Sequence, residues 1–352
     1  MAEDALRKRA VELDGKRRRR SLLAVLVLTA ALALGYVLCI TIGSVRMPLA
    51  DVWAALTGNA NWADEMIVCD IRAPRVACAA LVGAALSLSG LAMQALFRNP
   101  MASPSVLGIS SGASFGAAFH IAYGSAIILS SFGTMLCAFG MAMATMLLVY
   151  GLAYKKAGGV QTTMLLLAGM AVSALFSGFT SMIEFFSDAD TVTSIVFWML
   201  GSFDGRSWSD LRIMLPPIIL GIALVAFNAR ALNLMTAGES KAKALGVNVR
   251  RVRLMVLIGS SVLVATCVSF CGVIGFVGLI VPHIFRTLVG PDHRRLVPIC
   301  LLGGAVFLML VDTFARGAMP PYELPVGTVT SVIGAPFFLW ILRSRKNEVW
   351  RS

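Results

Sequence analysis

The sequence is poor in charged residues. Asp, Glu, Lys and Arg make up 14% of its 352 residues, whereas soluble globular proteins have about 25%. The 56 residues from Asn99 to Tyr154 contain none of the four. As helix, that stretch would be about 84 Å long, while one bilayer core is ~30 Å thick. The soluble, fibrous and disordered classes are therefore excluded, and the chain is expected to cross a membrane several times.

Motifs of the common enzyme classes are also absent. There is no G-x-x-x-x-G-K-[ST] loop for nucleotide phosphates and no H-E-x-x-H zinc motif. The only histidines are His120, His283 and His293, and no Ser/His/Asp or Cys/His arrangement is visible. The seven cysteines are an odd number and lie mostly in apolar runs, where Cys packs as a small hydrophobe. We expect no catalytic residue, no cofactor and no metal site, and transport rather than catalysis.

The apolar runs predict an all-α, polytopic membrane fold with about ten transmembrane helices. The predicted spans are 21–43, 74–97, 104–122, 126–153, 161–186, 211–229, 252–271, a short helix ending near Arg286, 296–315 and 326–342. Gly272, Gly275 and Gly278 interrupt the chain before the eighth span, as in broken membrane helices. A short amphipathic helix near 51–56 and an acidic interfacial helix over 189–203 are predicted outside the spans.

The first apolar run resembles a secretion signal because five basic residues, Lys16 to Arg20, precede it. It continues for 22 residues from Ser21 to Ile42, however, which is long enough to span a bilayer. We therefore predict an uncleaved first helix after a loosely ordered basic tail over 1–20.

The net charge of +12 is explained by topology rather than by nucleic acid. With both termini cytoplasmic, the inside segments hold 24 of the 30 Lys and Arg residues and the outside segments hold 6. This distribution follows the positive-inside rule. The chain is therefore predicted to be a multi-pass protein of the cytoplasmic (inner) membrane, with cytoplasmic tails over 1–20 and 346–352 and no nucleic-acid partner.

Four blocks of the sequence, in order, resemble one transporter family. They are Arg72–Arg75 leading through Gly83–Gly90 to Arg98–Gly108; Gly238-Glu239 with Ala242 and Leu245-Gly246; Gly275–His283; and Leu324–Gly327 with Gly334–Phe338. Over roughly 20–345 the chain is thereby similar to the FecCD-type, BtuC-like permeases. These are the membrane subunits of binding-protein-dependent ABC importers for iron–siderophores, heme and cobalamin.

The resemblance implies a permease domain over 21–345 and a membrane unit of two subunits, with the substrate pathway along their interface. An identical second subunit is favoured over a paralogue. It also implies two cytoplasmic ABC ATPase subunits, which fits the missing phosphate loop, and an extracytoplasmic substrate-binding protein, either free or lipid-anchored. Alternating access would be driven by ATP hydrolysis on the partner chains.

The polar segment 230–251 matches the family at Glu239, Ala242, Leu245 and Gly246. The resemblance implies a pair of short coupling helices that fit a groove of the ATPase, with Gly246 in the turn between them. A solvated loop is the alternative.

Arg72, Arg75 and Arg316 match family arginines that receive acidic residues of the binding protein. Outside segments carry 6 basic and 11 acidic residues, so these three would form a distinct basic patch whose exposed ion pairs act together. The alternatives are snorkelling at the interface or an i, i+4 pair between Asp312 and Arg316.

Thr162 and Thr163 match a family position thought to narrow the pathway, although hydroxyls at a helix start are also ordinary caps. Glu184 is the one carboxylate near the outer end of the same helix and is expected to reach the interface.

An iron chelate is the expected cargo, with cobalamin and heme as alternatives. An ion-coupled secondary transporter would need a carboxylate buried in mid-span. The clearest candidate, Asp312, has Arg316 one turn away. A membrane-embedded enzyme is the third possibility.

Overall fold

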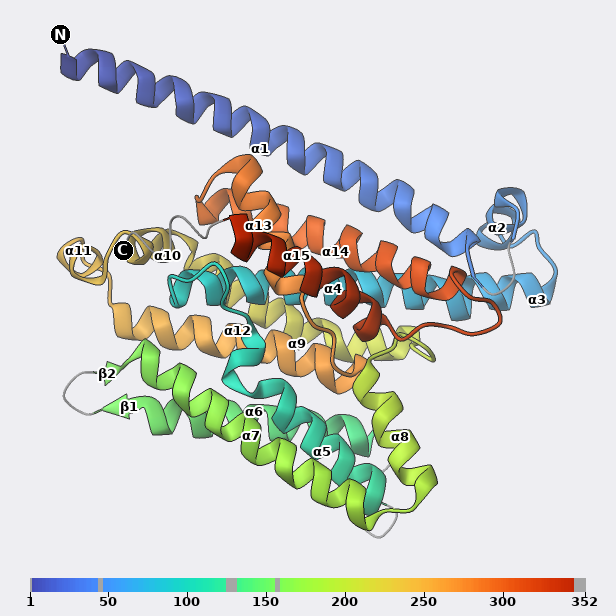
Figure 1. Cartoon of the computed structure of the whole chain (residues 1–352). Coiled ribbons are helices and arrows are strands. Elements are labelled where there is room, and N and C mark those ends of the chain that lie inside the picture. Colours follow the sequence, from blue (N-terminus) through green and yellow to red (C-terminus); the bar gives the residue numbers. More distant parts are fainter. Residues whose placement is uncertain (1, 44–46, 125–131, 156–158, 345–352) are drawn as a thin grey trace.

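The structure is a computed structural model that describes residues 2–43, 47–124, 132–155 and 159–344. The chain is almost entirely helical there (Figure 1), and the predicted all-α class is confirmed. The helices are α1 (Ala2–Thr41), α2 (Leu49–Leu56), α3 (Trp62–Glu65), the π-helix η1 (Met66–Arg72), α4 (Ala73–Leu96), the 3-10 helix η2 (Pro104–Leu107), α5 (Ile109–Tyr123), α6 (Gly133–Ala153), α7 (Thr162–Phe186), α8 (Ala189–Leu200), α9 (Trp208–Phe227), α10 (Ala229–Thr236), α11 (Glu239–Ala244), α12 (Val249–Cys271), α13 (Val277–Val289), α14 (His293–Gly317) and α15 (Val326–Ser344). A two-stranded hairpin joins α6 to α7 and consists of β1 (Tyr154–Lys155) and β2 (Gly159–Val160).

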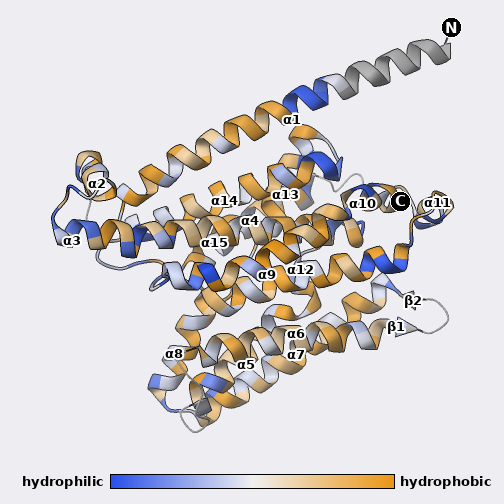
Figure 2. Cartoon of the chain, turned by 180° about the vertical axis from the view of Figure 1, so that it is seen from behind, coloured by the Kyte–Doolittle hydropathy of each residue, from blue (hydrophilic) through white to orange (hydrophobic). Residues whose placement is uncertain are grey.

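Seven helices of the described chain are long and apolar enough to cross a membrane: α1, the continuous α3–α4 segment, α6, α7, α9, α12 and α14. Three shorter apolar helices are α8, α13 and α15. The third predicted span is η2 followed by α5, and the eighth is α13. Figure 2 shows hydrophobic residues along most of the bundle, with hydrophilic residues gathered near its two ends, as a membrane-spanning protein requires.

The helices run between two ends that we name by their short helices (Figure 1). The α11 end carries α10, α11 and the β1–β2 hairpin, and α1 starts on this side. The α3 end carries α2, α3 and the loop 201–207. The predicted C-terminal tail, 346–352, lies outside the described residues.

The N-terminal tail differs from the prediction of a loosely ordered segment. The structure has one helix from Ala2 to Thr41, and its first half extends away from the bundle (Figure 1). The tail is rich in Ala, Leu, Glu, Lys and Arg, all of which favour helix, so low hydropathy alone does not end the helix at Ser21.

The centre of the bundle is α4, which packs against α14, α12 and α13. Gly83 of α4 faces Gly304 of α14, and a methyl group on either would overlap the backbone of the other. Gly90 meets Gly278 of α13 in the same way. Small residues between Gly83 and Gly90 thus let α4 touch its neighbours through their backbones.

The predicted break before the eighth span is also present. Helix α12 ends at Cys271, and Gly272 has a φ of 69° that favours glycine. Helix α13 begins after Phe276, which also has a positive φ, of 63°.

Side chains cap the N-terminal ends of both α8 and α9. Asp188 caps the start of α8, and hydrogen bonds from the backbone N–H and hydroxyl of Thr191 hold the pKa of its carboxyl below the usual value. Ser207 and Asp210 form a capping box at the start of α9. Asp204 lies in the loop just before α9, and its backbone N–H donates to the hydroxyl of Ser202 at 3.0 Å.

Candidate functional site

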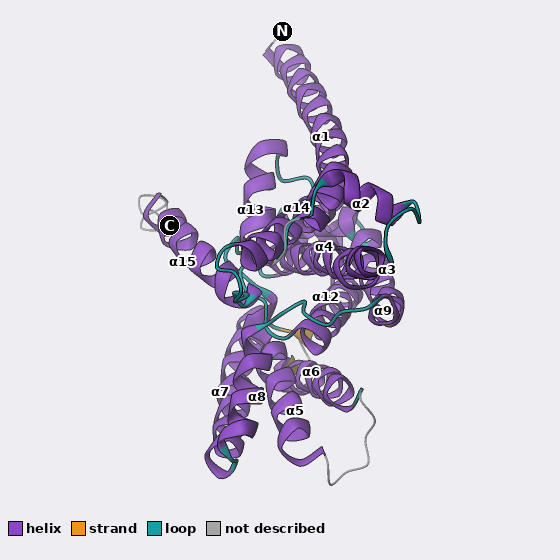
Figure 3. Cartoon of the chain, turned by 90° about the vertical axis from the view of Figure 1, so that its right-hand side faces the viewer, coloured by secondary structure: helices purple, strands orange, loops and turns teal. Residues whose placement is uncertain are grey.

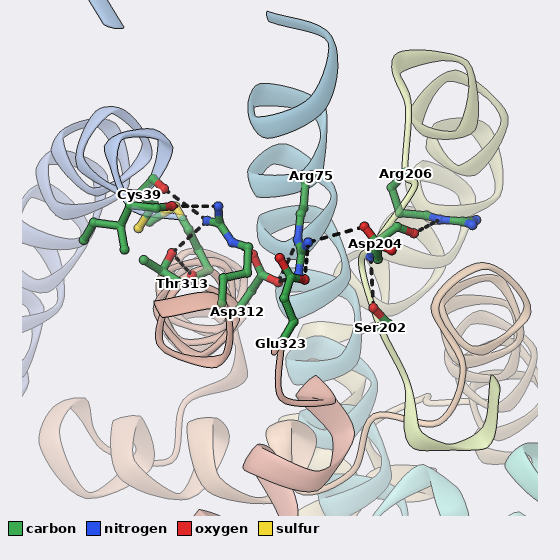
Figure 4. Close-up of polar contacts among 11 residues, drawn as sticks. Cys39, Arg75, Ser202, Asp204, Arg206, Asp312, Thr313 and Glu323 are labelled. Atoms are coloured by element: carbon green, nitrogen blue, oxygen red, sulfur yellow. Dashed lines mark hydrogen bonds and ion pairs between the residues drawn. The ribbon is translucent and has the colours of Figure 1, made fainter. Parts of the chain in front are cut away.

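A cluster of charged side chains lies at the α3 end, where α4, α14 and two loops meet (Figure 4). Arg75 of α4 donates from Nε and Nη2 to Oδ1 of Asp312 on α14, both at 3.1 Å. Its Nη1 donates to Oε2 of Glu323 at 2.7 Å and lies 3.6 Å from Oδ1 of Asp204. One arginine thus ties α4 to α14 and to the loops that precede α9 and α15.

Two further arginines hold the C-terminal end of α1. Arg316 donates to the carbonyl oxygen of Ile42 at 2.8 Å and to Oδ2 of Asp312 at 3.0 Å. Arg72 donates to the carbonyl oxygen of Ile40 at 2.9 Å. The last carbonyls of a helix lack partners within it and carry the negative end of its dipole, so cationic donors stabilise them.

The structure corrects the expected exposure of these arginines. Arg72, Arg75 and Arg316 are only 7%, 6% and 2% exposed, so the open basic patch expected from the sequence is wrong. Each guanidinium group meets carbonyl or carboxylate oxygens of its own chain. The alternative, an i, i+4 pair between Asp312 and Arg316, is present. The docking role of the three arginines stays a prediction.

Asp312 bears on the alternative of ion-coupled transport. Its side chain is fully buried and shared by Arg75 and Arg316. A carboxylate that is already paired with two guanidinium groups is poorly placed to bind a coupling cation. Within the described residues, no group of three or more His, Cys, Asp or Glu side chains is placed to hold a metal ion.

The predicted coupling segment forms two short helices, α10 and α11, at the α11 end. The turn between them is at Gly238, with a φ of 129°. Gly246 has a φ of 82° but lies between α11 and α12, so its predicted position between the two short helices is wrong. Its positive φ is a conformation that glycine adopts at little cost.

The matched residues of this segment have different environments. Glu239 pairs with Arg253 of α12 and lies 3.8 Å from Arg98. Ala242 is fully buried, whereas Leu245 is 67% exposed. Glu239 and Ala242 therefore position α11, and Leu245 is an apolar side chain left on the surface. Their role in coupling stays a prediction.

Helix α10 is tied to the start of α14. The Oδ1 atom of Asn233 accepts hydrogen bonds from the backbone N–H of His293 at 2.8 Å and from its Nδ1 at 2.7 Å. Its Nδ2 donates to Asp292 at 2.6 Å. Helix α14 carries Asp312 and Arg316 at its other end. The contact of α10 with α14 could not be predicted from the sequence, because its partners are 59 and 60 residues apart.

Thr162 and Thr163 open α7 beside the hairpin. The N-cap is Gln161, and no side chain caps the helix, so neither threonine is an N-cap. Their role in narrowing the pathway stays a prediction. The same helix supplies a polar pocket that sequence reasoning missed, and Glu184 lines it rather than only reaching the interface.

Comparisons with known proteins agree on one family. The model of the FecCD transport family matches residues 31–344. The cobalamin import system permease protein BtuC of Halobacterium salinarum is 43% identical over 282 residues, which cover 80% of this chain and 74% of that protein. The hemin transport system permease protein HmuU of Yersinia pestis is 39% identical, covering 96% of this chain and 99% of that protein. A solved structure described as an inward-facing conformation of a metal-chelate type ABC transporter has a TM-score of 0.82 and 34% identity, covering 91% of this chain and 98% of that one.

Proposed function

Because the chain belongs to the FecCD transport family and is an ABC importer permease, we propose that it carries an iron chelate across the cytoplasmic membrane. Energy comes from ATP hydrolysis on separate partner subunits. The observation that carries the proposal is the family match over residues 31–344, nearly the whole chain. The likeness to a metal-chelate type transporter and to a hemin permease supports an iron-containing cargo. The cobalamin permease among the relatives keeps cobalamin as the second candidate.

The partners follow from the same proposal. Two ABC ATPase subunits bind from the cytoplasm, and an identical second permease subunit completes the membrane unit, with a paralogue as the alternative. A substrate-binding protein delivers the chelate from outside. The α11 end faces the cytoplasm in this arrangement. The basic residues of α11 and of the start of α12 support this orientation through the positive-inside rule.

The experiment that tests the cargo is to isolate the binding protein encoded with this chain and identify the ligand that it retains. A ferric chelate is the expected result. A retained corrinoid would replace the iron chelate with cobalamin and leave the importer function unchanged.

If α10 and α11 couple the permease to its ATPase subunits, substitution of one exposed side chain should have a strong effect. Leu245→Asp should weaken binding of the ATPase subunits by about tenfold, because an apolar contact in the partner groove would be replaced by a charge. Insertion and folding of the permease should not change, since Leu245 is 67% exposed. Titration of purified ATPase against the permease in nanodiscs measures the effect.

Gly246 supplies a matched pair of variants for the same test. Gly246→Val should uncouple ATP hydrolysis from transport, whereas Gly246→Asn should be mild, because Asn tolerates the positive φ and Val does not. A Cβ at this position would contact nothing within 4 Å, so crowding is not the cause. Normal coupling in both Leu245→Asp and Gly246→Val would refute the coupling role.

The docking role is tested by neutralising the two carboxylates that contact Nη1 of Arg75, those of Asp204 and Glu323. Glutamates in place of the three buried arginines would disrupt the fold, so that substitution is uninformative. Instead, Asp204→Asn with Glu323→Gln should free Nη1 of Arg75 for an acidic residue of the binding protein. The affinity of the binding protein for the permease should rise about threefold at low salt and less at high salt.

The control for docking is Asp70→Asn, which removes an exposed negative charge outside the contacts of Arg75. Surface-plasmon measurements of the binding protein on the nanodisc-embedded complex give the affinities. An equal gain from the control would mean that only the net charge of this end matters, and no gain from the double variant would remove Arg75 from docking.

A further inference from the structure

A polar pocket lies between α5 and α7, near the end of α8, and these three helices are neighbours in the bundle (Figure 3). Its volume is about 290 Å³. It is lined by Ser110, Ser111, Ser114, Ser177, Thr180, Ser181, Glu184, Met199 and Val273. The lining from α7 belongs to the half of that helix nearer the α3 end. Hydroxyl groups from two facing membrane helices therefore surround one cavity.

The serine hydroxyls of this pocket differ from the hydroxyls of Ser173 and Thr180 on α7. In apolar surroundings, Ser and Thr side chains usually donate to the carbonyl oxygen four residues earlier. On α7, Ser173, which lies outside the pocket, does so toward Gly169 at 2.7 Å, and Thr180, which lines the pocket, does so toward Phe176 at 2.9 Å. The five lining serines donate no side-chain hydrogen bond to any described residue and are available to a solute. They are Ser110, Ser111, Ser114, Ser177 and Ser181.

Ser114 and Ser181 show that the pocket is polar at depth and open at its rim. Ser114 is only 5% exposed, yet its hydroxyl has no hydrogen-bond partner in the described chain. Ser181 is exposed on the surface of α7. Polar groups inside a membrane bundle face water or a polar solute rather than lipid, because lipid cannot satisfy their hydrogen bonds.

Glu184 sets the charge of the pocket. It is the only ionisable residue among the nine that line it, and its carboxylate makes no ion pair with a described residue. No Lys or Arg from α5, α7 or α8 lines the cavity to balance it. The pocket therefore carries a negative potential, which attracts cations and repels anions.

We propose that this pocket is a solute-binding part of the transport pathway that accepts an oxygen-rich solute, uncharged or positively charged, and rejects anions. The inference rests on the proposed importer function. Hydroxyls both donate and accept hydrogen bonds, so they suit the mixed donors and acceptors of an uncharged chelate. The carboxylate of Glu184 repels anions and thereby makes the pocket selective. An uncharged ferric hydroxamate fits this chemistry, whereas molybdate or a ferric citrate anion does not.

The test uses thiols placed in the pocket of the complete complex without binding protein. Ser181→Cys and Ser114→Cys are treated with methanethiosulfonate reagents of similar size and opposite charge, one with a trimethylammonium group and one with a sulfonate. Mass spectrometry of the modified peptides gives the rates. After correction for a free thiol, the cationic reagent should react about tenfold faster at position 181, given one carboxylate within several ångströms.

Glu184→Gln in the same background should reduce the preference to about twofold or less. Ser173→Cys is the control, because that side chain lies on α7 but outside the pocket. If Ser114→Cys does not assemble, the exposed position 181 still decides the question. Equal rates for the two reagents at position 181, or a preference unchanged by Glu184→Gln, would overturn the charge selection.

A transport measurement distinguishes a failure of this inference from a failure of the proposed importer function. Modification at position 181 should block ATP-driven uptake of the chelate that the binding protein carries. Uptake at the unmodified rate would place the pocket off the pathway and leave the importer function intact. Failure of the unmodified complex to transport at all would instead contradict the importer function.

Discussion

Asp312→Ala is expected to destabilise the permease by about 3–5 kcal/mol, because it leaves two buried arginines without their shared carboxylate. Asp312 is fully buried and accepts from Arg75 at 3.1 Å and from Arg316 at 3.0 Å. Arg75 would keep Glu323, but Arg316 would keep only carbonyl and hydroxyl oxygens. The midpoint of thermal unfolding in detergent, followed by size-exclusion chromatography, measures the loss.

The matched control for this variant is Asp204→Ala. Its carboxylate also lies near Arg75, at 3.6 Å, but its side chain is 80% exposed, so the expected loss is about 0–1 kcal/mol. Equal stability of Asp312→Ala and Asp204→Ala would show that the buried cluster does not hold the α3 end together.

Gly90→Val is expected to prevent correct assembly of the bundle. A side chain at Gly90 would overlap the backbone of Gly278, and backbone cannot move aside as a flexible side chain can. Overpacking in cores costs about 1–3 kcal/mol and occasionally more, and here α4 and α13 would have to separate. The yield of monodisperse protein extracted from membranes is the measurement, and it should fall to a small fraction of wild type.

Gly140→Val is the control for the second variant. Gly140 lies within α6, and a Cβ there meets nothing within 4 Å. Because both substitutions add the same β-branched side chain to a membrane helix, they differ mainly in what that side chain meets. Normal yield of Gly90→Val would contradict the close approach of α4 and α13.

The spans could be predicted because hydropathy and length depend on local sequence. The break at Gly272 was predicted for the same reason, since glycines interrupt an apolar run. The tail before Ser21 was missed because its charges suggested disorder, whereas its residue types favour helix. Local composition predicts where the chain is apolar better than where a helix starts.

The environments of the arginines could not be predicted, because their partners are remote in sequence. Arg75 meets Asp312 and Glu323 across 237 and 248 residues. The count of charges outside the membrane predicts an exposed Arg75, but the fold surrounds this side chain with carboxylates. Only the i, i+4 spacing of Asp312 and Arg316 could be recognised in advance.

The polar pocket between α5 and α7 could be predicted from the sequence only in part. The spacing of Ser177, Ser181 and Glu184 places them on one face of a helix, and this was visible in the sequence. The sequence does not reveal that α5 packs opposite and adds Ser110 and Ser114. Polar faces of membrane helices can therefore be found from sequence, but the cavities between them cannot.

We propose that this chain is the membrane subunit of an ATP-driven importer for an iron chelate. The most direct measurement is uptake of a radiolabelled ferric chelate into proteoliposomes that contain the permease with its ATPase subunits. We expect uptake only when ATP is on the ATPase side and the loaded binding protein is on the other side, with no effect of collapsing ion gradients. Uptake that proceeds without ATP and stops when a proton or sodium gradient is collapsed would contradict it.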